Sequence, residues 1–148
     1  MVFIDEPLFR MVINNLFMNA INYTLQGGTI KIEYREINKG EMIGEKLLNE
    51  NSVAVIIEDN GYGIPENQQD KLFTKFFRAD NARQRQTDGT GLGLYIVKFI
   101  LDNTGGSVWF ESPARNAESI ASAGGKENKG SIFYVVIPMT GMRSKKDK

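Results

Sequence analysis

Three asparagines are spaced so that their side chains could act together. Asn15, Asn19 and Asn22 stand at positions i, i+4 and i+7 of a segment rich in large apolar residues, so on a helix they share one face. A buried amide without a hydrogen-bond partner costs about 1–3 kcal/mol, which means that backbone, water or a ligand must satisfy these groups. Carboxamide oxygens suit a hard cation such as Mg²⁺, which takes its other ligands from waters and phosphates. The alternative is a solvated polar face.

A single carboxylate, Asp59, ends an apolar stretch and begins the first glycine motif, residues 59–65. Gly61 and Gly63 permit positive φ angles and let another group approach the backbone. An ionised aspartate only accepts hydrogen bonds, so Asp59 could accept one from the exocyclic amine of adenine, which guanine does not offer at the same ring position. A plain Asx turn is the other interpretation of this motif.

Glycines recur in the second glycine motif, residues 89–94, directly before an apolar helical pattern. At the entrance of a helix, free backbone N–H groups and the positive end of the helix dipole can receive phosphate oxygens. The motif lacks the Gly-Lys-Ser/Thr of a P-loop, and no strand leads directly into it as in a Rossmann motif. A glycine-rich hinge would produce the same pattern.

The segment between the two glycine motifs has the composition of a lid. It contains aromatic side chains and, beyond them, a polar loop with basic ones, namely Phe73, Phe76, Phe77, Arg78, Arg83 and Arg85. The phenylalanines could anchor such a lid, and an arginine could meet phosphates when it closes. A surface helix with one apolar face is the alternative, but it accounts for fewer of these residues.

The composition excludes several other kinds of site. The 148 residues include neither cysteine nor histidine, so the chain cannot form disulfides, cysteine nucleophiles, Ser-His-Asp triads or the usual zinc sites. Its 18 basic and 18 acidic side chains balance, so no net charge attracts nucleic acid or an anionic membrane. No apolar run approaches the roughly 20 residues of a membrane helix. We expect one domain over residues 1–142, followed by a charged tail over residues 143–148.

The hydrophobic pattern predicts the elements that would position these residues. Helical spacing covers residues 7–24 and 92–101, and residues 66–77 can form a short helix. Alternating and β-branched residues predict strands at 29–37, 52–58, 107–112 and 131–138. The polar stretch 38–51 is predicted to be a loop or a hairpin excursion between the first two strands.

The order of these motifs resembles the histidine-kinase branch of the Bergerat-fold ATPases. The family's N box, first glycine box, F box and second glycine box have counterparts in residues 15–24, 59–63, 72–78 and 89–94. Its closing strands are similar to residues 105–112 and 130–138. The resemblance implies a two-layer α/β sandwich of the Bergerat type, with a mixed sheet covered on one face by helices and a mobile lid over ATP.

The same resemblance implies roles for individual residues. Asn15 and Asn19 would hold Mg²⁺ and the phosphates, and would act in catalysis together with Arg83 and Arg85 from the lid. Asp59 would accept the hydrogen bond of the adenine amine. The other residues implied to bind the nucleotide are Asn22, Tyr23, Gly61, Gly63, Ile64, Phe77, Gly89, Thr90, Gly91, Leu92, Gly93 and Leu94.

Two positions depart from the family pattern. Met11 stands four residues before Asn15, where related kinases often carry a glutamine or a carboxylate, and Asn22 occupies a position that is commonly basic. Both changes remove polar or charged groups near the triphosphate. They bear on catalysis more than on binding.

The implied activity is phosphoryl transfer from Mg-ATP to a histidine. Because this chain contains no histidine, the acceptor would belong to separate dimerisation helices, and the aspartate of a response regulator would receive the group afterwards. The isolated domain is expected to be a cytoplasmic monomer without a nucleic-acid partner, cut from a longer parent that could be anchored in the cell membrane.

Two alternatives belong to the same superfamily. One is an ATP-driven conformational switch, as in topoisomerase, mismatch-repair and heat-shock chaperone ATPases, which use a glutamate of the first helix to activate water. Met11 stands at that position here. The other is a degenerate module that only binds nucleotide or partner proteins. A serine kinase of the anti-sigma type is disfavoured by the F box and the long lid.

Overall fold

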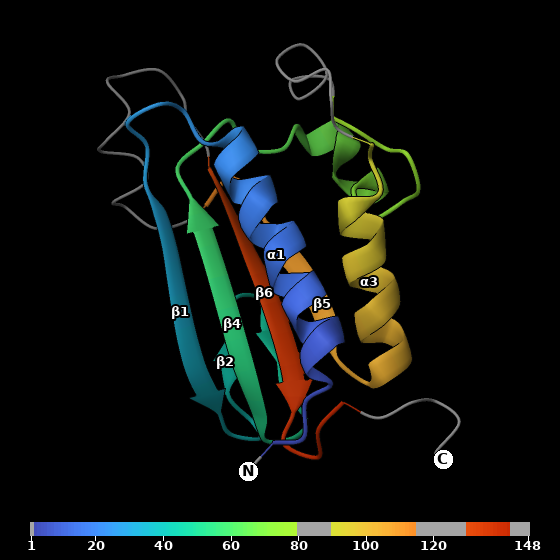
Figure 1. Cartoon of the computed structure of the whole chain (residues 1–148). Coiled ribbons are helices and arrows are strands. Elements are labelled where there is room, and N and C mark those ends of the chain that lie inside the picture. Colours follow the sequence, from blue (N-terminus) through green and yellow to red (C-terminus); the bar gives the residue numbers. More distant parts are fainter. Residues whose placement is uncertain (1, 80–89, 115–129, 143–148) are drawn as a thin grey trace.

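Two helices lie side by side across one face of a four-stranded sheet, in a computed structural model that describes residues 2–79, 90–114 and 130–142 (Figure 1). Helix α1 spans Glu6–Tyr23 and helix α3 spans Gly93–Thr104. The sheet has the strand order β1-β4-β6-β5, whose members span Ile30–Ile37, Ser52–Asp59, Ser131–Pro138 and Ser107–Glu111. The predicted two-layer α/β sandwich is confirmed.

All strand pairings between described residues are antiparallel, so the mixed sheet implied by the resemblance is corrected in this respect. Strand β4 pairs with β1 and with β6, and β6 pairs with β5. β4 and β5 therefore run in the same direction, and the connection between them passes through α3. They do not pair with each other, because β6 lies between them. This placement brings the start of β6 beside the end of β4, where Ser131 is opposite Asp59.

Helix α1 is set in place by signals at both of its ends. The carboxylate of Asp5 accepts a hydrogen bond from the backbone N–H of Leu8 at 3.1 Å, and the Thr24 hydroxyl donates to the carbonyl of Ala20 at 2.7 Å. Between these ends, α1 buries Val12, Leu16 and Ala20 against the sheet. Helix α3 ends at Gly105, which takes the left-handed conformation typical of a helix C-terminus. Both helices match the predicted segments to within a few residues.

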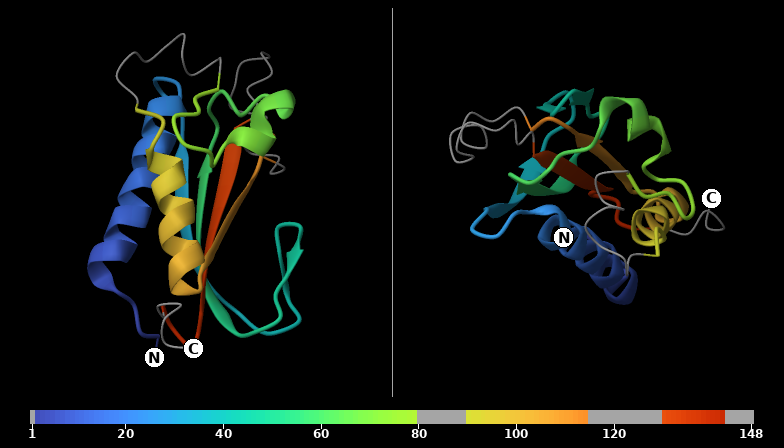
Figure 2. Two further views of the ribbon diagram at one scale, coloured as in Figure 1. Left: turned by 90° about the vertical axis from the view of Figure 1, so that its right-hand side faces the viewer. Right: turned by 90° about the horizontal axis from the view of Figure 1, so that it is seen from above.

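Residues 38–51 form a hairpin that covers the second face of the sheet, on the side away from the helices (Figure 2). Its short strands are β2, Met42–Ile43, and β3, Lys46–Leu47. The hairpin encloses a separate cluster of buried side chains, and Lys46 Nζ lies 4.4 Å from the centre of the Trp109 ring. The predicted hairpin excursion is confirmed, and it supplies a second small core.

The helix predicted over residues 66–77 is shorter than expected. Only Glu66–Lys71 is helical, as the 3₁₀ helix η1, and turns follow it. Two local features account for this: the Thr74 hydroxyl donates to the carbonyl of Lys71 at 2.7 Å, and Phe76 has a φ angle of 60°. Over the three described ranges, none of the helices is long and apolar enough to span a bilayer.

The second core predicts a difference between two neighbouring substitutions in β2. Ile43 is 1% exposed, whereas Met42 is 54% exposed. We expect Ile43→Ala to lower the free energy of unfolding by about 2–4 kcal/mol, because it leaves a cavity under the hairpin. Met42→Ala should change the free energy of unfolding by less than about 0.5 kcal/mol. Urea denaturation measures both, and equal effects would show that the hairpin does not close a core.

Candidate functional site

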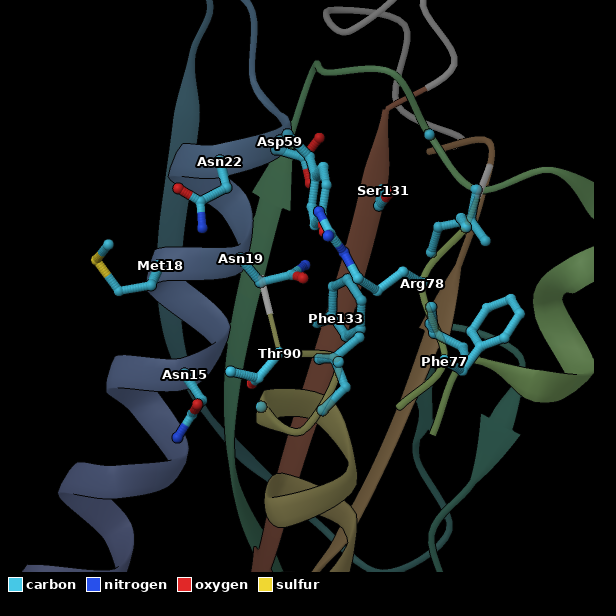
Figure 3. A pocket seen from close by; sticks show the side chains of 18 residues that line it. Asn15, Met18, Asn19, Asn22, Asp59, Phe77, Arg78, Thr90, Ser131 and Phe133 are labelled. Carbon is cyan, nitrogen blue, oxygen red and sulfur yellow. The ribbon is translucent and has the colours of Figure 1, made fainter. Parts of the chain in front are cut away.

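A pocket of about 180 Å³ opens between α1, the start of α3 and the upper end of the sheet (Figure 3). A single water needs roughly 10–15 Å³, so this pocket is larger than a packing defect. Most of the residues expected to bind a nucleotide line it, namely Asn15, Asn19, Asn22, Tyr23, Asp59, Gly63, Ile64, Phe77, Thr90, Gly91, Gly93 and Leu94. Residues from the four motifs, which are separate in the sequence, therefore meet around this pocket.

Some expected site residues are not among the lining residues. Gly61 and Leu92 are described but do not line the pocket. Gly89, Arg83 and Arg85 lie outside the described residues, so their predicted roles stay predictions.

The face of α1 that carries the asparagines borders the pocket. Asn15 Nδ2 donates to the carbonyl of Met11 at 2.8 Å, which leaves its Oδ1 directed toward α3. A Cβ atom at Gly93 would lie 2.9 Å from that oxygen, so glycine allows this close approach. Asn19 projects into the pocket, and Asn22 lies at its exposed rim (Figure 3). The pocket thus has carboxamide groups along one wall.

The N-terminus of α3 forms the wall facing these asparagines. Thr90, Gly91 and Leu94 line the pocket there. The first N–H groups of this 12-residue helix have no intrahelical partners, as in every α-helix, and the side chain of the N-cap residue, Leu92, does not cap them. Together with the helix dipole, they form a region that favours anionic oxygens.

Asp59 lies at the opposite end of the pocket and is 3% exposed. Burial raises the pKa of its carboxyl to about 6, although hydrogen bonds from the backbone N–H groups of Gly61 and Ser131 favour the ionised form. The bond from Gly61 measures 2.9 Å. Above pH 6 this end of the pocket therefore holds a buried anion that accepts hydrogen bonds.

The end of α1 holds the turn that follows Asp59 in the first glycine motif. The backbone N–H of Tyr62 donates to the carbonyl of Tyr23 at 3.1 Å. A Cβ atom at Gly61 would collide with the same carbonyl oxygen. Glycine is therefore required at position 61 for packing against α1, and Gly61 supports the pocket without lining it.

Sequence reasoning missed six residues that line the pocket: Met18, Leu72, Arg78, Ala79, Ser131 and Phe133. Met18 carried a usable signal, because it lies on the helix between Asn15 and Asn22. Arg78 was included in the lid but not in the site, and it extends across the pocket toward the end where Asp59 lies (Figure 3). Ser131 and Phe133 reach the pocket through the register of β6 with β4, which local sequence does not reveal.

Three kinds of polar group are arranged along the length of the pocket. A buried hydrogen-bond acceptor lies at one end, a helix N-terminus lies at the other, and carboxamides stand beside the helix end. No group of three His, Cys, Asp or Glu side chains within the described ranges is placed to hold a metal ion. The predicted metal ligands, Asn15 and Asn19, both line the pocket, and their amide oxygens are of the kind that fits a cation also bound by phosphates.

The chain belongs to the family of histidine kinase-, DNA gyrase B- and HSP90-like ATPases, whose model matches residues 4–141. The probable sensor kinase SilS of Salmonella typhimurium is 37% identical over 118 residues, which cover 80% of this chain and 21% of that protein. The adaptive-response sensory kinase SasA of Synechocystis sp. is 38% identical over 138 residues, which cover 93% of this chain and 29% of that protein.

The chain is also similar to a solved structure of a histidine kinase. The catalytic domain of histidine kinase ThkA, in a nucleotide-free form, superposes with a TM-score of 0.64 and 31% identity, covering 93% of this chain and 70% of that one. The resemblance to the histidine-kinase branch is therefore confirmed. The chain spans less than a third of the two curated relatives, since it covers 21% and 29% of their lengths.

The raised pKa of Asp59 predicts how its amide variant responds to pH. Its folded-state pKa of about 6 lies above the ordinary value of 3.8, so the wild type loses stability as the pH rises between these two values. Asp59→Asn cannot ionise. The free energy of unfolding of the variant, minus that of the wild type, should therefore increase by about 2–3 kcal/mol from pH 4 to pH 7.5.

Urea denaturation at a series of pH values measures this difference. The same change at the exposed Asp70, Asp70→Asn, controls for the loss of one negative charge. A difference between Asp59→Asn and the wild type that stays constant with pH would contradict the effect of burial. Any fixed cost of the new amide group cancels from the comparison.

Proposed function

We propose that this domain binds Mg-ATP and transfers the γ-phosphoryl group to a histidine on a separate dimerisation domain, for relay to an aspartate of a response regulator. The observation that carries the proposal is one pocket with the buried Asp59 at one end, the N-terminus of α3 at the other, and the amides of Asn15 and Asn19 beside the helix end. Membership of the ATPase family and similarity to sensor kinases support it.

The Asp59 end of the pocket would hold the base. A buried carboxylate accepts a hydrogen bond from the amino group of adenine, whereas the carbonyl of guanine at the equivalent ring position would face it as a second acceptor. Leaving a buried acceptor unpaired is costly, so ATP is favoured over GTP. Apolar side chains such as Leu72 and Phe133 line the pocket as well, and they suit the faces of a purine ring.

The end formed by α1 and α3 would hold the phosphates. Bound Mg²⁺ would neutralise charge on the phosphate oxygens during transfer. Asn15 and Asn19 are proposed as its protein ligands, and the N–H groups at the start of α3 as partners of the remaining phosphate oxygens. Arg83 and Arg85 are proposed to meet the phosphates from the lid.

The acceptor must come from outside this chain, which has no histidine. The protein's part is then to position ATP so that an incoming imidazole meets the γ-phosphorus, and positioning accounts for most of the rate in such transfers. We propose that residues 1–142 make up the catalytic domain, and that it works in the cytoplasm as part of a longer kinase.

The asparagine wall predicts a change in metal dependence. Asn19→Ala should weaken ATP binding in the presence of Mg²⁺ by about tenfold, which corresponds to about 1.4 kcal/mol, because a metal-ligating amide is lost. Asn14→Ala is the matched control, since Asn14 is an exposed asparagine of α1 that does not line the pocket. Calorimetry with and without Mg²⁺ measures both variants. If Asn19→Ala keeps the full effect of Mg²⁺, the amides are merely structural.

The absence of histidine predicts that activity requires a second component. Incubated alone with γ-labelled ATP, the chain should give neither labelled protein nor appreciable phosphate release. Adding the parent's histidine-bearing helical hairpin should produce an acid-labile, base-stable phosphoramidate, because a nucleophile then lies within reach of the bound ATP.

Each alternative predicts a different outcome of the same assay. Rapid hydrolysis by the chain alone would favour the ATP-driven switch, and label that is stable in acid would favour a serine kinase. ATP binding without any label after the hairpin is supplied would favour a degenerate nucleotide-binding module.

A further inference from the structure

Ile64 lines the pocket, and two side chains, one from the neighbouring η1 and one from beyond β5, hold its two backbone polar groups. The Ser112 hydroxyl, just beyond β5, accepts a hydrogen bond from the Ile64 N–H at 2.9 Å. The carboxamide of Gln69, in η1, donates to the Ile64 carbonyl at 3.0 Å. The chain just after Gly63 is therefore fixed from both sides.

Ser112 also connects this point to the start of β6. Its hydroxyl donates to the carbonyl of Gly130 at 2.9 Å, and its own carbonyl accepts the second N–H of Gln69 at 2.8 Å. The Gly130 N–H in turn donates to the carbonyl of Gly61 at 3.1 Å. Ser131, the next residue, lines the pocket and contributes a backbone hydrogen bond to Asp59.

We propose that Gln69 and Ser112 are positioning residues for the base end of the nucleotide pocket. They act through Ile64 and Gly130, and they set the first glycine motif and the start of β6 at the spacing that Asp59 needs to receive adenine. This inference rests on the proposed binding of ATP, and it assigns a role to two residues that do not line the pocket.

The two hydrogen bonds of Gln69 allow a test by a substitution that keeps the shape of the side chain. Both N–H groups of its carboxamide are donated to backbone carbonyls, those of Ile64 and Ser112. A carboxylate at the same place has the same shape but no donor, so it would face two carbonyl oxygens with negative charge. Gln69→Glu therefore removes the hydrogen bonds to the carbonyls of Ile64 and Ser112. It leaves both hydrophobic cores intact, because neither core contains Gln69.

The test is calorimetric titration of ATP into the wild type, Gln69→Glu, Ser112→Ala and the control Asn67→Asp. Asn67 is an exposed residue of the same η1 helix, so its variant carries the same amide-to-carboxylate change. We expect the dissociation constant for ATP to rise about tenfold in Gln69→Glu and several-fold in Ser112→Ala, and to stay unchanged in Asn67→Asp. The ratio of dissociation constants with and without Mg²⁺ should keep its wild-type value, because the metal end of the pocket is held by α1 and α3.

Hydrogen exchange of the Ile64 amide, measured without nucleotide, tests the connection independently of ATP. Exchange should be faster in both variants than in the wild type and in Asn67→Asp. A wild-type dissociation constant in Gln69→Glu would overturn the inference, and so would an equal loss in Asn67→Asp or an altered Mg²⁺ ratio. A wild type that binds no ATP would overturn the proposed function as well, which distinguishes the two failures.

Discussion

The burial of one carboxylate is the constraint on which the rest of the pocket depends. Asp59 is 3% exposed, and an ionised group in that place must receive hydrogen bonds from the protein or from a ligand. The structure provides two of them from backbone N–H groups, those of Gly61 and Ser131. To do so, it must bring the end of α1, the first glycine motif and the start of β6 together at one corner of the sheet. There the backbone N–H of Tyr62 donates to the carbonyl of Tyr23, and the N–H of Gly130 donates to the carbonyl of Gly61. A Cβ atom at Gly61 or Gly130 would collide with backbone atoms, so neither position has room for a larger side chain.

The two faces of the sheet pack against different elements and enclose separate hydrophobic cores. The helix-covered face carries the larger core and the pocket, whereas the hairpin of residues 38–51 closes a smaller core on the other face. Trp109 and Tyr134 stack in this second core with ring centres 5.4 Å apart. Because no residue of the hairpin lines the pocket, the length of this excursion can differ from the family pattern while the site keeps its geometry.

Local sequence was sufficient to predict the parts of the site that lie within one element. The helical spacing of Asn15 and Asn19 and the glycines before α3 follow from the spacing of neighbouring residues, and the structure places them together. Residues that reach the pocket through long-range pairing could not be found in this way. Ser131 and Phe133 do so because β6 inserts between β4 and β5. The same insertion makes the sheet antiparallel, which a family-level expectation of a mixed sheet did not foresee.

The shortened η1 shows the same limit at a smaller scale. Apolar spacing predicted a helix through residue 77, but a side-chain hydrogen bond from Thr74 and a left-handed Phe76 end the regular structure earlier. Such competition between local hydrogen bonds is not visible in a hydrophobic pattern.

The central place of β6 has a consequence for how the molecule is made. A ribosome delivers residues 131–138 after both of the strands that β6 must join, so β4 and β5 have no common partner in the nascent chain until then. Pairing between segments so distant in sequence is slow, because a large loop must close before any contact forms. The helices can form early, but the corner that buries Asp59 cannot. The pocket can therefore be completed only after β6 has been synthesised, because Ser131 and Phe133 line it.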